Sequence, residues 1–297
     1  MARKRKILSV RRAALSAAVA GVLLLGCVAL YFLQTRRTAT ALRDRAIALE
    51  QREHWAKAAS YWFRYTAFRP RDVQARIRLA KSYDESAGSR SRKSRAVDLY
   101  QHALGLAASS GDDAVRNRAK EMRLRLAELH LDLGEDENAL RAAGELDDAF
   151  HRRRIRALAL RSQFQSSRAE SLLEDVRSEA SAALKLEPGC VELAELLANV
   201  IHNHLVKLRV GDRDALIKEA DEAMERLAAA APNSVEARLA RHRYFLRRDP
   251  EKAAVEISVA VQLAPRNPDV LLAAAGHAEK QSRWAEAEQR YQELIRE

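Results

Sequence analysis

Glycine and proline are scarce in this chain, with ten and six copies among 297 residues. Because tight turns depend on these two residues, their scarcity argues against a protein built from many short strands. Alanine, leucine, arginine and glutamate are abundant instead, and all four favour helices. The composition predicts an all-α protein, and its 47% hydrophobic residues can supply a sizeable core.

Cysteine is nearly absent, with only Cys27 and Cys190. Cys27 lies in an uncharged apolar stretch, so the rest of the chain cannot contain a disulfide framework. The sequence also has no nucleophile-elbow motif, no glycine-rich phosphate loop and no cysteine pair at metal-binding spacing. We therefore expect no catalytic, cofactor-binding or small-molecule substrate site, and no enzyme activity.

Histidine offers the remaining candidates for a metal site. His202 and His204 are two positions apart, which places them on different faces of a helix, whereas helical zinc pairs stand four apart. The other six histidines are scattered singly, at positions 54, 102, 130, 151, 242 and 277. We expect no metal site.

Positive charge is concentrated near the N-terminus. The net charge is +11, but residues 1–35 carry +6, residues 36–95 carry +10 and residues 96–297 carry −5. This gradient suits a chain held beside anionic lipid better than one that binds nucleic acid, because the distal two thirds would repel a polyanion. We expect no nucleic-acid partner; nucleic-acid binding is a third alternative, and it predicts steep salt dependence of binding.

The N-terminal region predicts a membrane anchor. Residues 13–33 form an uncharged stretch that would span roughly 30 Å as a helix, with Tyr31 near its end and Arg36 and Arg37 just beyond. Basic residues in the segment 1–12 favour a cytoplasmic N-terminus. We expect a linker at 34–38, followed by an extracytoplasmic domain at 39–297.

Two alternatives to a spanning helix are open. A cleaved signal peptide would also begin with basic and apolar residues, but this stretch is long and lacks a clear small-residue cleavage site. The tetrapeptide Leu24-Leu25-Gly26-Cys27 is similar to a bacterial lipobox, in which Cys27 would be lipidated. Six apolar residues follow Cys27, however, where a lipoprotein normally turns polar. Lipidation also leaves a membrane tether.

Small and bulky residues recur beyond the anchor. A twelve-residue step joins Ala46 to Ala58, and two further alanine pairs repeat it, at 127 and 139 and at 275 and 287. Bulky residues stand four positions after alanines 58, 96 and 287, at Trp62, Tyr100 and Tyr291, and prolines close the pattern at positions 70, 232 and 265. The alanines at positions 220, 253 and 287 recur at a nearly constant interval.

This pattern resembles the tetratricopeptide repeat family, whose hairpins recur at about the same interval. The resemblance implies a right-handed α-solenoid of about seven helical hairpins over residues 39–297, with a concave groove that binds a protein or peptide partner. The expected hairpins cover residues 39–71, 72–110, 114–149, 152–188, 190–233, 234–266 and 267–297. An insertion at 87–94, AGSRSRKS, is expected to be a loop. No capping helix follows the last hairpin, so we expect more chain or a partner to cover that end.

Two groups of basic residues are candidate contacts with anionic headgroups or an acidic partner. One is the segment with Arg90, Arg92, Lys93 and Arg95, and the other comprises Arg64, Arg69, Arg71, Arg76, Arg78 and Lys81. A solvated basic face is the simpler interpretation of both.

The leading functional hypothesis is a membrane-tethered scaffold whose groove binds a partner protein or peptide. The alternative is a regulatory or docking region of a larger enzyme or envelope assembly factor, with its catalytic part beyond this chain.

Overall fold

A computed structural model gives the fold, and it describes residues 2–86, 88–108, 111–209 and 211–296, with side chains from Leu15 onward. The side chains of the basic segment predicted at 1–12 and of Ala13 and Ala14 lie outside the described residues, as does Ala87 in the predicted loop. Throughout the described ranges the regular structure is helical, which confirms the all-α prediction. The chain divides into two compact units, residues 1–122 and 123–297.

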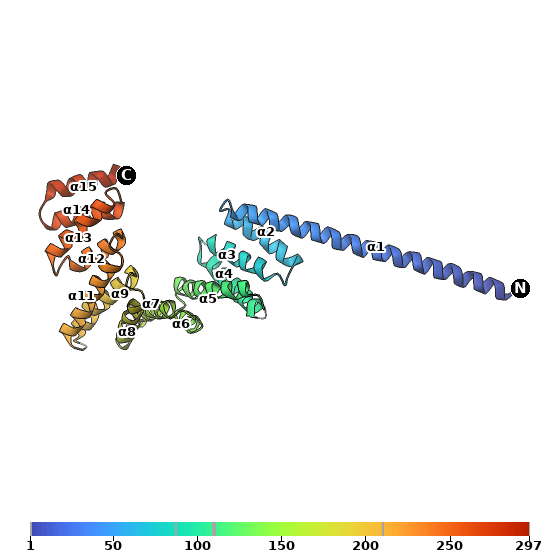
Figure 1. Cartoon of the computed structure of the whole chain (residues 1–297), viewed down its shortest axis with the longest axis horizontal. Helices are drawn as coiled ribbons and strands as arrows, with labels where there is room; N and C mark the ends of the chain where they lie inside the picture. The colour runs from blue at the N-terminus through green and yellow to red at the C-terminus, as the bar shows by residue number, and fades with distance from the viewer. Residues whose placement is uncertain (1, 87, 109–110, 210, 297) are drawn as a thin grey trace. The chain divides into compact units, whose positions relative to one another are not determined.

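The first unit contains four complete helices and part of a fifth: α1 (Ala2–Glu50), α2 (Trp55–Phe68), α3 (Val73–Glu85), α4 (Arg90–Ala108) and the start of α5 (Asp113–Leu133). Figure 1 shows α2 beside only the C-terminal part of α1, whose N-terminal part extends alone. Residues 34–38, expected as a linker, are helical. Because they contain neither glycine nor proline, nothing in their sequence interrupts the helix.

Helix α1 carries the apolar stretch on its surface. Its segment Leu15–Glu50 is long and apolar enough to cross a membrane, by length and composition, and none of its most apolar window is buried in the protein. A signal sequence near an N-terminus has the same properties.

The second unit continues α5 and adds the remaining helices: α6 (Asp136–Gly144), α7 (Ala149–Ser167), α8 (Ser171–Leu186), α9 (Val191–Val200), the π-helical segment η1 (Ile201–Leu205), α10 (Val206–Leu208), α11 (Arg213–Ala230), α12 (Val235–Phe245), α13 (Pro250–Leu263), α14 (Pro268–Lys280) and α15 (Trp284–Arg296). Segments α9, η1 and α10 follow one another without a break and form the first helix of one hairpin. The helices match the seven predicted hairpins, with α1 and α2 forming the first.

Local sequence signals set the helix ends. Asp72, Asp148 and Ser234 each accept a hydrogen bond from the backbone N–H three positions later, as N-cap residues do. Prolines stand two positions beyond the ends of α2, α11 and α13, as the sequence predicted.

One predicted loop is shorter than expected. Of residues 87–94, only Gly88 and Ser89 separate the described helices, and α4 begins at Arg90. The Ser89 carbonyl accepts the N–H groups of Arg92 and Lys93, which starts the helix. Arginine and lysine are good helix formers, so the basic residues after Gly88 belong to the start of α4.

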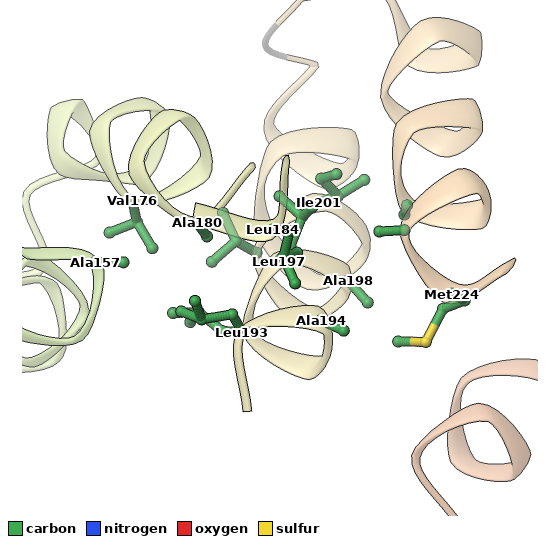
Figure 2. Close-up of a cluster of buried hydrophobic side chains, with 14 of the residues drawn as sticks. Ala157, Val176, Ala180, Leu184, Leu193, Ala194, Leu197, Ala198, Ile201 and Met224 are labelled. Carbon is green, nitrogen blue, oxygen red and sulfur yellow. The ribbon is translucent and has the colours of Figure 1, made fainter. Parts of the chain in front are cut away.

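The core contains small residues where helices cross. Ala46 and Ala58 are fully buried, as are Ala127 and Ala139, while Ala275 and Ala287 are 0% and 3% exposed. The largest described core cluster lies in the second unit, where Figure 2 shows Leu193, Leu197 and Ile201 beside Val176 and Leu184 from α8. Close approach of helices at alanine positions leaves room for these larger side chains to interdigitate.

Candidate functional site

The second unit contains a groove lined mainly by first helices of successive hairpins. We define the distal groove as this open cavity of about 1030 Å³ together with its extension of about 520 Å³. The two parts share Glu236, Arg243, Leu246 and Lys280, so they are continuous. Helices α7, α9 with η1, α12 and α14 supply nearly all of the lining.

The distal groove has apolar as well as polar surface. Leu196 and Ala240 line the larger part, and Leu239, Leu272 and Ala273 line the extension. Leu272 is 53% exposed, which is unusual for leucine on a helix that packs against three neighbours. Such a surface can accept apolar side chains of a partner segment.

One wall of the groove is a polar network that joins three helices. The hydroxyl of Tyr244 donates to Oδ1 of Asp221 at 2.6 Å, and His202 Nε2 lies 3.1 Å from the same hydroxyl. Arg248 bonds to both Tyr244 and Asp221, and its guanidinium stacks over the Tyr244 ring at 4.9 Å. We call these four residues the Tyr244 network, which fixes η1, α11 and α12 to one another.

Burial and charge shift the proton affinities in this network. Burial, followed by the positive charge of Arg248, lowers the pKa of His202, so the imidazole is neutral at pH 7. Burial and the hydrogen bond to Asp221 raise the pKa of Tyr244, which stays protonated and acts as a donor. The network therefore positions side chains, and its histidine carries no charge at neutral pH.

The π-helical segment sets the direction of both central histidines. His202 lies against Tyr244 of α12 with ring centroids 5.3 Å apart, whereas His204 lies against Phe164 of α7 at 4.9 Å. The two rings thus lie against side chains of different helices. π-helical segments often occur at functional sites, and this one borders the distal groove.

The groove has a small excess of unpaired cations over unpaired carboxylates, because Glu236 and Asp269 also line it without an ion pair in the described ranges. Two of its acids are paired, because Glu192 bonds to Arg154 at 2.9 Å and Glu195 bonds to Arg243 at 3.0 Å. Three further lining cations, Arg161, Arg247 and Lys280, are exposed and form no ion pair within the described ranges. They come from α7, from the turn after α12 and from α14, so they distribute positive charge along the groove.

The basic residues predicted from sequence lie elsewhere, in the first unit. Arg90, Arg92, Lys93 and Arg95 occupy the first turns of α4. Arg92 donates to the carbonyl of Ser86 at 2.9 Å, and Arg95 lies 3.7 Å from Asp98. Their contact with headgroups or an acidic partner stays a prediction.

The second basic group is partly engaged. Arg78 bonds to Glu50 at 2.5 Å, and Lys81 lies over the ring of Trp55 at 5.9 Å. Cys27 is exposed on α1, and its lipidation stays a prediction.

Within the residues that the structure describes, no three His, Cys, Asp or Glu side chains come together in a group that could hold a metal ion. The lining of the distal groove was not predicted from the sequence. Its signal was available in part, since Glu195, Asn199 and His202 recur at helical spacing on one face of a first helix. The sequence does not show which helices lie beside that face, so the face could not be distinguished from one exposed to solvent.

The fold was compared with known proteins. No family model matches the chain, and no curated protein matches it. Among solved structures, a tetratricopeptide repeat protein from Parabacteroides merdae ATCC 43184 is similar over 87% of this chain and 93% of its own, with 12% identity and a TM-score of 0.56. The C-terminal part of a TPR repeat-containing protein from Cytophaga hutchinsonii is similar over 85% and 94%, with 13% identity and a TM-score of 0.52.

These similarities identify the class of protein by its fold. The chain is an all-helical protein with the tetratricopeptide repeat fold, preceded by one long apolar helix. The predicted resemblance is confirmed at the level of the fold.

Proposed function

We propose that this protein is a membrane-tethered scaffold whose distal groove binds an acidic, partly apolar segment of a partner protein. The observation that carries the proposal is the set of three exposed cations, Arg161, Arg247 and Lys280, which line one groove without acidic partners among the described residues. A partner carboxylate near each would gain a charge-assisted contact.

The apolar lining supports a peptide or helix as the partner. Leu272 and Leu246 offer surface to aliphatic side chains, while Asn199 and Asn203 carry amides that can bond to a partner's backbone or side chains. Nucleic acid fits less well, because its continuous phosphate charge would meet Glu192, Glu195 and Glu236, whereas a peptide can place single carboxylates at the three cations. The scaffold has no catalytic step in this proposal.

The tether in this proposal is helix α1. Its apolar stretch is exposed, and a helix satisfies its own backbone hydrogen bonds in a bilayer. We propose that it spans the membrane with a cytoplasmic N-terminus and that the repeats lie on the opposite side, with lipidation at Cys27 as the alternative anchor.

Binding of a synthetic probe to the full chain in nanodiscs tests the groove. The probe is a fluorescent peptide that alternates glutamate with leucine, and the comparison peptide carries lysine in place of glutamate. We expect the acidic peptide to bind more tightly, and the double variant Arg247→Glu, Lys280→Glu to weaken its binding by about tenfold. Fluorescence anisotropy measures both affinities.

The matched control is Arg213→Glu, which reverses an exposed charge on α11 outside the groove. It should leave the affinity unchanged. Equal binding of the acidic and basic peptides, or an unchanged affinity in the groove variant, would contradict the proposal.

A further inference from the structure

A second surface with both charged and apolar residues lies on the first hairpin, at the end opposite the turn. This end of the hairpin is the one nearest the apolar part of α1. Helix α1 ends at Glu50 and α2 begins at Trp55, so a short turn reverses the chain. Phe68 is the last residue of α2 and is separated from Trp55, the first residue of α2, by one helix length. Arg37 lies the same number of residues before Glu50, the last residue of α1. At about 1.5 Å of rise per residue, both lie about 20 Å from the turn and level with each other.

Core packing supports this register. Ala46 and Ala58 are buried near the turn, and Ala39 and Tyr65 are buried nearer the other end, all in one cluster. Arg43 is close enough to Tyr65 to act on its pKa, as the same antiparallel register requires. Helix α2 thus returns toward the apolar stretch, which Figure 1 shows as the free part of α1.

The returning end of α2 exposes an aromatic ring between basic residues. Residues 67–71 are all exposed, and Phe68 is 45% exposed although α2 packs against helices on two sides. Arg69 and Arg71 have no ion pair within the described ranges. The adjacent acid, Asp72, is already engaged, since it accepts the Tyr65 hydroxyl at 2.8 Å and the Ala75 N–H at 3.0 Å.

Helix α1 adds two more cations at the same level. Arg36 and Arg37 are exposed and follow closely after Leu33, the last residue of the apolar stretch. We call Arg36, Arg37, Phe68, Arg69 and Arg71 the juxtamembrane surface. Positive charge with an exposed aromatic ring, held at the end of an apolar helix, matches the chemistry of a bilayer interface.

We propose that the juxtamembrane surface rests on the anionic headgroups of the bilayer that α1 enters, with the Phe68 ring at the interface and the arginines on lipid phosphates. The inference depends on the proposed membrane tether and extends it. Because α1 continues without a break into the first hairpin, this second contact fixes how the hairpin stands on the membrane.

The geometry favours this surface over the basic start of α4 as the lipid contact. Glu50, at the turn farthest from the apolar stretch, bonds to Arg78 and Ser82 of α3. Helix α3 therefore runs away from the membrane, and α4 begins at its far end. The segment from Arg90 to Arg95 would stand about 20 Å from the level of Arg37, beyond the reach of screened headgroup charge.

A purely structural role for Arg69 and Arg71 does not explain why the Phe68 ring is exposed. Basic residues near the C-terminus of a helix stabilise its dipole, which can explain Arg69 and Arg71. That role leaves the exposure of Phe68 unexplained.

Thiol labelling of the full chain in nanodiscs tests the contact. Ala67→Cys places an exposed thiol beside Phe68 and retains the ring, in a background with Cys27→Ala and Cys190→Ala. The reaction rate with a charged maleimide is measured in nanodiscs of neutral lipid and in nanodiscs with anionic phosphatidylglycerol. We expect the anionic lipid to slow labelling by about fivefold, and high salt to reverse this effect.

Two comparisons make the test specific. Arg69→Glu with Arg71→Glu should restore fast labelling at position 67. Ser94→Cys, an exposed position among the basic residues of α4, should label equally in both lipids. Circular dichroism of each variant establishes that the helices are retained.

The outcomes separate the contact from the tether. If alkaline carbonate extracts the full chain from vesicles, the tether fails and the contact fails with it. If the chain stays in the membrane but position 67 labels equally in both lipids, or charge reversal leaves its rate unchanged, only the contact is overturned.

Discussion

The indole nitrogen of Trp62 donates a 2.7 Å hydrogen bond to Oε1 of Glu50, across the first hairpin. The other carboxylate oxygen accepts Arg78 of α3 at 2.5 Å, and Ser82 approaches Oε1 at 3.3 Å. One partly buried carboxylate thus joins α1, α2 and α3. The contact lies at the end of α1 that enters the repeats, so it couples the long apolar helix to the first two hairpins.

Glu50→Ala should destabilise the α1–α3 packing by about 1–3 kcal/mol, because Trp62 and Arg78 each lose a partner in a partly buried place. Hydrogen exchange of the α2 and α3 amides in the full chain measures the local loss. Glu85→Ala, at an exposed carboxylate on α3, is the control and should change exchange little. Equal effects of the two substitutions would show that the Glu50 contact contributes nothing.

Leu197→Ala should cost about 2–5 kcal/mol of unfolding free energy, since it removes a fully buried side chain from the largest described core cluster and leaves a cavity. Urea unfolding followed by circular dichroism gives the value. Leu186→Ala truncates a leucine that is 55% exposed and should cost less than about 1 kcal/mol. A small loss at Leu197 would mean that the second unit lacks the packed core described above.

Arg241 bonds to two carboxylates that differ in burial, and this allows a matched comparison. Glu256, on α13, is buried and also bonds to Arg238 at 2.8 Å, whereas Glu225, on α11, is largely exposed and lies 3.4 Å from Arg241. Glu256→Ala should cost about 3–5 kcal/mol, because it leaves buried charge uncompensated. Glu225→Ala should cost less than about 1 kcal/mol in the same urea titration. The reverse order would contradict the assignment of burial.

The paired histidines of α12 and α14 predict acid sensitivity. His242 and His277 are buried with ring centroids 5.1 Å apart, and burial is the main cause that lowers the pKa of each. The charged groups that act on them are Arg243, Glu256, Lys280, Arg283 and Glu286. Both imidazoles are neutral in the folded protein at pH 7.

The sign of the effect follows from linkage. Below the unfolded pKa of about 6.5, the unfolded chain binds protons that the folded chain does not, so stability falls as the pH decreases. We expect the unfolding free energy to decrease between about pH 7.5 and 5.5, and His242→Gln with His277→Gln to reduce this dependence, while the contribution of His202 remains. His102→Gln, at an exposed site on α4, should leave the slope unchanged. A slope that the double variant retains would assign the sensitivity to other groups.

The hairpins were predictable because their signals are local. Alanines at a twelve-residue step and prolines after helices act within one hairpin, and the structure places them as expected. The boundary error has the same origin. Gly88 and Ser89 suggested a longer loop, although the residues after them favour a helix.

The distal groove could not be predicted from the sequence, for a different reason. Arg161, Arg247 and Lys280 are far apart along the chain, and only the stacking of α7, α12 and α14 brings them to one groove. Likewise, the sequence showed only that His202 and His204 lack metal-binding spacing, and the contact of His202 with Tyr244 comes from the packing of η1 against α12.

The sequence alone determined that the chain is helical, repeats in hairpins and carries an apolar segment, because periodicity and composition act over a few turns. Only the tertiary structure decided which cations remain unpaired and which basic residues stand beside the apolar helix. Whether two charged residues pair, and which residues of neighbouring helices lie side by side, depends on the distances between helices. Buried alanines set those distances because they allow the helices to approach closely.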